Sequence, residues 1–300
     1  MGPGIAGNVE GVRLGLLHPG EMGAAIGATL VGAGHQVRWA SQGRSTRTAQ
    51  RAAAAGLVDA GTIAGVVTAS EAVISVCPPD AARDLATAVL AAAPTGWSGC
   101  YLDANAIAPG TFQEIVGLRW GRGVRLVDGG IIGPPPTRAG VCRLYLSGPD
   151  APAMAALFAG SDLEAVAISD RPGDASALKL AYASWSKASQ ALLLTARAVA
   201  EAQGVGRWLQ AEWERAGGGL LADSDRAAEA AVTKGWRWSG EMREVATLLR
   251  DNGLPDGFHL AAAEVFARVP RRQAADHAPE VSELLRGLRR PGPATPTQEE

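Results

Sequence analysis

Lysine is scarce in this sequence, and long apolar runs are missing. The only lysines are Lys179, Lys187 and Lys234, because arginine takes nearly every other basic position. A lysine on a helix that lines a site therefore merits attention. No stretch of about 18 uncharged apolar residues occurs, and the first residues lack the basic and apolar segments of a secretory signal. We expect a cytoplasmic protein with no membrane partner.

An excess of charge and a pattern of metal ligands are missing as well. The 28 basic and 30 acidic residues leave a net charge of −2, which offers no basic field for nucleic acid. Cys77, Cys100 and Cys142 are too widely spaced for a disulfide framework or a zinc site. His259 and His277 have no partners at ligand spacing. We expect neither a nucleic-acid partner nor a metal.

The hydrophobic pattern divides the chain into two parts. Between residues 10 and 170, short apolar strands alternate with helical segments, which is typical of a doubly wound parallel sheet. After residue 174 the strand signal disappears, and a helical run without glycine or proline continues to residue 203. We predict the α/β class, with an all-helical C-terminal domain at 174–290 for substrate binding and dimerisation, and a disordered tail at 291–300.

The expected elements can be placed by residue range. The strands are expected near residues 12–17, 36–40, 72–77, 99–103, 123–128 and 143–147. The helices are expected near 20–33, 45–56, 79–93, 109–119, 174–203, 207–215, 223–233, 239–252, 257–268 and 278–288. A turn at Gly129 and Gly130 is expected after the fifth strand.

The first strand runs into a turn and a helix of small residues, which is the context of a dinucleotide-binding fingerprint. Gly20 would let the backbone approach a pyrophosphate, and N–H groups at the helix start would face it. An ordinary glycine-containing turn is the alternative, because His18 stands where the fingerprint has glycine. The pattern predicts a Rossmann domain at 10–170. Its first cofactor-binding residues are expected to be His18, Pro19, Gly20, Glu21 and Met22.

The second strand ends without the acid that NAD enzymes use to hold the ribose hydroxyls. Ser41, Arg44 and Ser45 follow it, and these side chains can bind and neutralise a 2′-phosphate. This favours NADP(H) as the cofactor, and the alternative is that the arginine only solvates a helix start. Further cofactor-binding residues are expected at the carboxyl ends of the next two strands. These are Cys77, Pro78 and Asn105.

Three segments together resemble the β-hydroxyacid dehydrogenase and 6-phosphogluconate dehydrogenase superfamily. They are residues 15–34 (GLLHPGEMGAAIGATLVGAG), 125–136 (RLVDGGIIGPPP) and 173–182 (GDASALKLAY). The stretches at 235–242 and 253–258 resemble a poorly characterised subgroup with a 6-phosphogluconate-dehydrogenase-like helical domain. The resemblance implies a dehydrogenase with a Rossmann domain followed by that helical domain.

The resemblance implies that Lys179 is the catalytic lysine near the start of the long helix. Helical spacing places Tyr182 on the same face, where it could relay a proton to or from the lysine as general acid or base. The alternatives are a lysine whose stem covers apolar surface and a tyrosine that is buried in a hydrogen bond. The family's asparagine four residues after the lysine is Ala183 here.

The substrate loop keeps part of the family pattern and changes the rest, because Ile132 replaces the family's serine. The usual grip on a substrate carboxylate is therefore altered. Tryptophans of the helical part could wall a pocket for a bulkier substrate, although such residues more often form a core or a dimer interface. The expected substrate residues are Asp128, Ile132, Gly133, Trp236, Trp238 and Glu241.

These patterns predict an NADP(H)-dependent oxidoreductase that transfers hydride to or from a small hydroxy or oxo substrate. An imine reductase and a catalytically silent NADPH-binding protein are the alternatives. We also expect a homodimer formed through the helical domain, with a monomer as the alternative. The expectation of a dimer rests on an apolar stripe along the long helix, which we expect to pack against other helices. The stripe comprises Leu178, Ala181, Trp185, Ala188, Leu192 and Val199.

Overall fold

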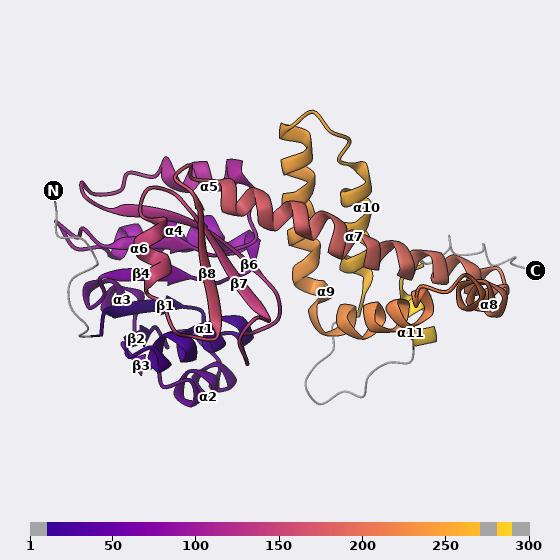
Figure 1. Cartoon of the computed structure of the whole chain (residues 1–300), viewed down its shortest axis with the longest axis horizontal. Helices are drawn as coiled ribbons and strands as arrows, with labels where there is room; N and C mark the ends of the chain where they lie inside the picture. The colour runs from indigo at the N-terminus through magenta and orange to yellow at the C-terminus, as the bar shows by residue number, and fades with distance from the viewer. Residues whose placement is uncertain (1–10, 271–280, 290–300) are drawn as a thin grey trace, which may run out of the picture. The chain divides into compact units, whose positions relative to one another are not determined.

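The computed structural model of the chain describes residues 11–270 and 281–289. The chain divides into two compact units, one up to Ala181 and one from Tyr182 onward. Helix α7 (Asp174–Ala202) begins in the first unit and continues into the second (Figure 1). The expected fold class, a Rossmann sheet followed by an all-helical region, is confirmed. The tail expected at 291–300 lies outside the described residues.

The first unit is built on an eight-stranded sheet in the order β3-β2-β1-β4-β5-β6-β7-β8. All neighbouring strands are parallel except β6 and β7. Because β1 leads to β2 on one side and lies next to β4 on the other, the topological switch point falls between β1 and β4. The strands are β1 (Arg13–Leu17), β2 (Gln36–Trp39), β3 (Val58–Asp59), β4 (Ala72–Ser75), β5 (Cys100–Asp103), β6 (Arg125–Ile132), β7 (Cys142–Ser147) and β8 (Leu163–Ser169).

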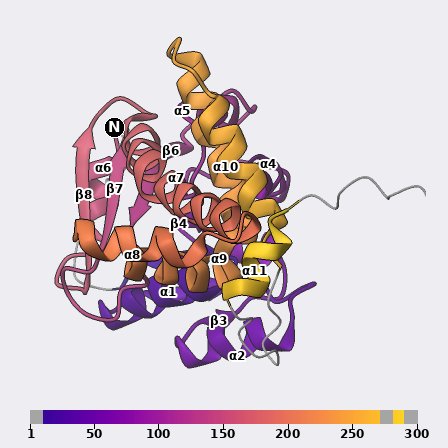
Figure 2. The same ribbon diagram turned by 90° about the vertical axis from the view of Figure 1, so that its right-hand side faces the viewer.

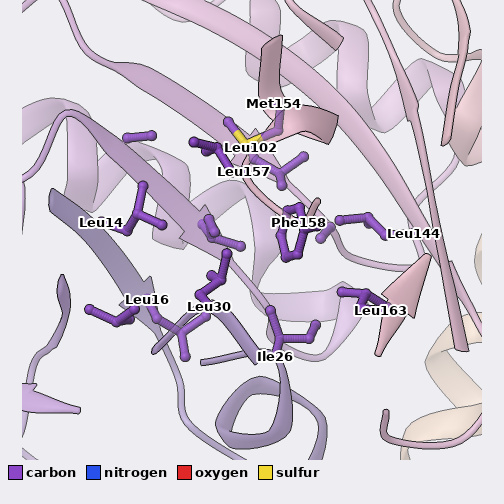
Figure 3. Packing of buried hydrophobic residues seen from close by; sticks show 14 of the residues in the cluster. Leu14, Leu16, Ile26, Leu30, Leu102, Leu144, Met154, Leu157, Phe158 and Leu163 are labelled. Carbon is purple, nitrogen blue, oxygen red and sulfur yellow. The ribbon is translucent and has the colours of Figure 1, made fainter. Parts of the chain in front are cut away.

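Successive residues of a strand point to opposite faces of the sheet, so each buried strand supplies apolar side chains to both faces. Helices cover both of these apolar faces. Leu14 and Leu16 of β1 belong to one apolar layer, whereas Leu17 belongs to the other. The first layer contains residues of α1 (Glu21–Gly32), α2 (Thr46–Ala54) and α6 (Ala151–Ala156), and Figure 3 shows part of it. The second contains residues of α3 (Ile63–Thr68), α4 (Ala82–Ala92) and α5 (Pro109–Val116). A 3₁₀ helix, η1 (Pro79–Ala81), precedes α4.

The expected turn at Gly129 and Gly130 was wrong, because both residues lie inside β6. A Cβ atom on Gly130 would lie 2.6 Å from the carbonyl oxygen of Ala175 and 2.7 Å from Cβ of Lys179. The glycine is therefore required by the close approach of α7 to the strand, not by a turn.

The described residues of the second unit form helices and their connections. After α7 follow α8 (Gly206–Ala216), α9 (Leu220–Asp251), α10 (Gly257–Arg268) and α11 (Val281–Gly287). Where two helices were expected, α9 is continuous, and Gly235 at the expected break lies against α10. Helix α10 lies beside α9 (Figure 1 and Figure 2), and Ser239 Oγ donates to the carbonyl of Ala263 at 3.0 Å. None of the helices among the described residues could span a membrane.

The apolar stripe expected to pack along α7 is mostly exposed. Trp185 is 70% exposed, and Leu192 and Val199 are more than half exposed. Of the stripe, only Ala188 is buried. Another face carries further buried residues, most of them alanines, since alanine lets neighbouring helices come close. They include Ala183, Ala191, Leu194 and Ala198.

Candidate cofactor and active site

The turn between β1 and α1 is tight, and its backbone geometry depends on His18 and two glycines. His18 has a φ of +65°, and within the described ranges it is the only non-glycine residue with positive φ. Its carbonyl accepts the N–H of Gly20 at 2.7 Å and would lie 2.4 Å from a Cβ atom on Gly23, which therefore has to be glycine. A Cβ atom on Gly20 would have its nearest neighbour at 4.0 Å. Open space thus lies before the N-terminus of α1, where a pyrophosphate could approach.

The charge of Arg44 acts on two groups near the switch point, His18 and Cys77. Burial lowers the pKa of His18 to about 4, and the charge of Arg44 adds to this effect. Burial likewise raises the pKa of the Cys77 thiol to about 12, while Arg44 and Ser75 oppose the rise. At neutral pH the histidine is uncharged and the cysteine is a thiol, so Arg44 is the group among them that can neutralise an anion.

The other residues predicted for this part of the site shape the loops around it. Ser45 caps α2, because its Oγ accepts the N–H of Thr48 at 3.3 Å. The carbonyl of Ser41 accepts the N–H of Arg44 at 3.0 Å, which closes a tight turn. Pro19 is buried, and Glu21 is exposed in the first turn of α1. Met22 packs against the first apolar layer, and Pro78 is the N-cap residue of η1.

Asn105 ties together the loops that follow β4 and β5. Its Nδ2 donates to Ser75 Oγ and to Asp103 Oδ2, each at 2.9 Å, and its Oδ1 accepts the N–H of Cys77. The side chain is 3% exposed. The structure thus places Asn105 at the expected edge with its amide bound to protein groups, and its contact with a cofactor stays a prediction.

Asp128 holds the first turn of α7. Its Oδ2 accepts the N–H groups of Gly173 at 3.1 Å and Ser176 at 2.9 Å, and also the hydroxyl of Ser147 at 2.8 Å. Its Oδ1 accepts the hydroxyl of Ser176. Ser147 Oγ in turn accepts the N–H of Ala175 at 3.0 Å. Burial raises the pKa of Asp128, and these donors oppose the rise.

Lys179 lies one turn further along α7, against β6 at Gly130. Its charge acts on Cys142 of β7, although burial is the larger influence and raises the pKa of that thiol to about 11. Tyr182 belongs to the second unit, where it is 46% exposed and contacts Trp185 edge to face with 6.2 Å between ring centroids. The proton-transfer roles of both residues stay predictions.

The predicted substrate residues fall in different places. Ile132 ends β6, and Gly133 follows with a φ of +122°, where a Cβ atom would lie 2.2 Å from the carbonyl oxygen of Val141. In α9, Trp238 and Glu241 are buried, whereas Trp236 is 42% exposed. Trp238 packs on Phe266 at 5.2 Å between centroids and lies under the ammonium group of Lys187 at 4.4 Å.

Three residues of the site escaped the sequence analysis. Asp103, Ser147 and Ser176 supply or receive hydrogen bonds that fix Asn105 and Asp128. A usable signal was present for Asp103, an acid at the end of an apolar strand two residues before Asn105. No such signal marked the serines. No cluster of possible metal ligands occurs in the part of the chain that the structure describes.

The fold is that of 3-hydroxyisobutyrate dehydrogenases and related dehydrogenases. A 3-hydroxyisobutyrate dehydrogenase of Mycobacterium tuberculosis, solved with L-serine, has a TM-score of 0.65 at 20% identity, over 93% of this chain and 100% of that one. A conserved hypothetical protein from Sinorhizobium meliloti has a TM-score of 0.62 at 24% identity, over 93% and 95%. The fold that the sequence resemblance implied is thus confirmed.

Residues 200–269 match the family model described as a domain of unknown function, DUF1932. Among curated proteins, no sequence matches this chain significantly. A reductive aminase from Aspergillus terreus, in complex with NADPH and ethyl levulinate, has a TM-score of 0.54 at 20% identity, over 93% of this chain and 100% of that one. The same fold therefore serves dehydrogenases and reductases of imines among the known structures.

Proposed function

We propose that the protein is an NADP(H)-dependent oxidoreductase that transfers hydride to or from a small hydroxy or oxo substrate. The observation that carries the proposal is the open glycine turn at the switch point with Arg44 beside it. Gly20 would admit the pyrophosphate. Ser41, Arg44 and Ser45 would hold the 2′-phosphate, because no acid follows β2 to hold free ribose hydroxyls.

The protein's own part in the reaction is proton transfer at Lys179. A bound nicotinamide would supply or accept the hydride, and the oxygen of the substrate then needs a proton donor or acceptor. Lys179 is held on the same sheet that carries the nucleotide turn. Tyr182 is proposed to relay the proton. Asp128, Ile132, Gly133, Trp236, Trp238 and Glu241 stay the proposed substrate residues, with one revision argued below.

The substitution Lys179→Met tests this assignment. Loss of a general acid or base should lower turnover by about 100-fold or more, while the affinity for NADPH stays nearly unchanged. NADPH fluorescence titration and steady-state kinetics measure the two effects. Lys234→Met, which removes a lysine of α9, is the matched control. Normal turnover in Lys179→Met would remove the lysine from the mechanism.

Reduction of an imine is the second candidate, and the likeness of fold to an NADPH-bound reductive aminase favours it. Panels of carbonyl compounds and cyclic imines, assayed with the same NADPH, separate the two reactions. Oxidation of NADPH by imines alone would replace the proposed dehydrogenase by an imine reductase. Tight NADPH binding without oxidation by any compound would point to a silent cofactor-binding protein.

We also propose a cytoplasmic homodimer. Free thiols at Cys77, Cys100 and Cys142 agree with a reducing compartment. The exposed apolar side chains of α7 agree with a second copy that covers them. The test of the assembly is given in the Discussion.

A further inference from the structure

The first turn of α7 is fastened to the sheet by side chains from two strands. Asp128 of β6 accepts the N–H groups of Gly173 and Ser176, and Ser147 of β7 accepts that of Ala175. The first N–H groups of a helix have no partner within it, and the positive end of the helix dipole attracts a carboxylate. Side chains that lie 28 to 48 positions away in the sequence thus accept hydrogen bonds from the start of the helix.

The carboxylate of Asp128 is fully occupied by these partners. Both oxygens accept hydrogen bonds, from two backbone N–H groups and from the hydroxyls of Ser147 and Ser176. The side chain is 0% exposed. A substrate would have to displace one of these donors to reach it, which would leave a buried donor without a partner at a cost of about 1–3 kcal/mol.

Gly130 completes the attachment one turn further on. It lies two residues after Asp128 on β6, and the missing side chain lets Cβ of Lys179 and the carbonyl of Ala175 approach the strand backbone. The hydrogen bonds fix the height and rotation of the first turn of α7, and the contact at Gly130 fixes its distance from the sheet. Together, the hydrogen bonds and this contact determine the position of the Lys179 Cβ atom, from which the side chain projects.

We infer that Asp128 is a positioning residue for Lys179 and not a substrate ligand. This inference rests on the proposed function of Lys179. Through the N–H groups of Gly173 and Ser176, Asp128 holds the helical turn from which the lysine projects. Loss of this attachment misplaces the ammonium group, and a shift of about 1 Å can cost on the order of 100-fold in rate.

The lysine itself provides a readout that needs no substrate. Reductive methylation with ¹³C-formaldehyde labels all three lysines, and their dimethylamino signals are followed by NMR in the NADPH-bound protein. In Asp128→Asn and Ser176→Ala, we expect the Lys179 signal to move while those of Lys187 and Lys234 stay in place. Ser176→Ala keeps the backbone N–H groups, so it serves as the mild variant if Asp128→Asn does not fold. Ser189→Ala, whose hydroxyl bonds to the carbonyl of Trp185 in the same helix, is the control.

Kinetics with whichever carbonyl or imine the panels identify give the second readout. A positioning role lowers kcat about tenfold or more with KM nearly unchanged. A raised KM with normal kcat and an unmoved Lys179 signal would overturn the inference and restore Asp128 as a substrate ligand. The two proposals fail separately. If Lys179→Met has normal turnover, the catalytic role is lost, but a moved Lys179 signal in Ser176→Ala still demonstrates the attachment.

Discussion

Asp103 is a buried acid whose proton is held more tightly in the folded protein than in the unfolded chain. It is 1% exposed at the end of β5, and burial raises its pKa from 3.8 to about 7, against the hydrogen bonds from Asn105. Between about pH 4 and 7 the folded state keeps a proton that the unfolded state has released. The contribution of Asp103 to the free energy of unfolding is therefore greatest below about pH 4 and falls as the pH rises to 7.

We expect the substitution Asp103→Asn to remove the loss of unfolding free energy that Asp103 causes between about pH 4 and 7. His18 acts in the opposite direction, because its pKa is lowered from 6.5 to about 4 and its contribution rises with pH between these values. Urea denaturation of the wild type and the variant at several pH values between 4 and 8 measures the difference. Asp84→Asn, which changes an exposed acid of α4, serves as the control. Parallel profiles for the wild type and Asp103→Asn would contradict the expectation.

Local patterns predicted the glycine turn between β1 and α1 but not the hydrogen bonds around Asp128. Gly20 and Gly23 follow directly after an apolar strand, so a few residues of sequence reveal the turn. The partners of Asp128 lie 45 to 48 residues away on the helix and 19 residues away on β7. No periodicity connects such positions, because they meet only when β6, β7 and α7 are assembled. The sequence therefore indicated Asp128 by resemblance alone.

At the scale of elements, prediction succeeded where a segment is long or fully buried. The buried residues of β1, β4 and β5 form short apolar runs, and α7 carries no glycine or proline for 29 residues. The strands β3 and β8 and the helices α3 and α6 were missed. β3 has two residues, and α3 and α6 have six each. β8 lies at the sheet edge and has a single buried residue, so none of these elements leaves a clear hydrophobic period.

The contact between β6 and α7 should be sensitive to a single methyl group. Gly130→Ala would place Cβ within 2.7 Å of the backbone and Cβ atoms of α7, which no side-chain rotation can relieve. We expect the free energy of unfolding to fall by about 1–3 kcal/mol, as for other overpacked cores. Gly32→Ala at the end of α1 is the control, because its Cβ would meet nothing within 4 Å. Equal stability of the two variants in urea would show that α7 can move away from β6 at no cost.

At the scale of the whole molecule, we expect the exposed apolar face of α7 to form the interface of a homodimer. Tyr182, Trp185, Leu192 and Val199 are 46%, 70%, 55% and 58% exposed, and they recur at helical spacing along one side. Burial of such side chains contributes about 1.5–3 kcal/mol each, so a second copy that covered them would be held firmly. A two-fold arrangement is the commonest way to bury the same face twice.

Light scattering at micromolar concentration tests this expectation. The wild type should have twice the mass of the 30.7 kDa chain. Trp185→Glu and Leu192→Glu should shift it toward one chain, because a buried charge without a partner is costly. Val58→Glu, at an exposed apolar position of β3, should leave the mass unchanged. A wild-type mass near one chain that does not change on concentration would refute the dimer.

In mechanical terms, the turn held by Asp128 and Gly130 is a clamp on the part of α7 that belongs to the first unit, Asp174 to Ala181. These residues rise about 12 Å along the helix axis, so a tilt of about 5° at the clamp displaces their far end by about 1 Å, roughly a third of the length of a hydrogen bond. Two hydrogen-bonded side chains, Asp128 and Ser147, and one missing methyl group at Gly130 therefore set how precisely this part of the helix is held on the sheet.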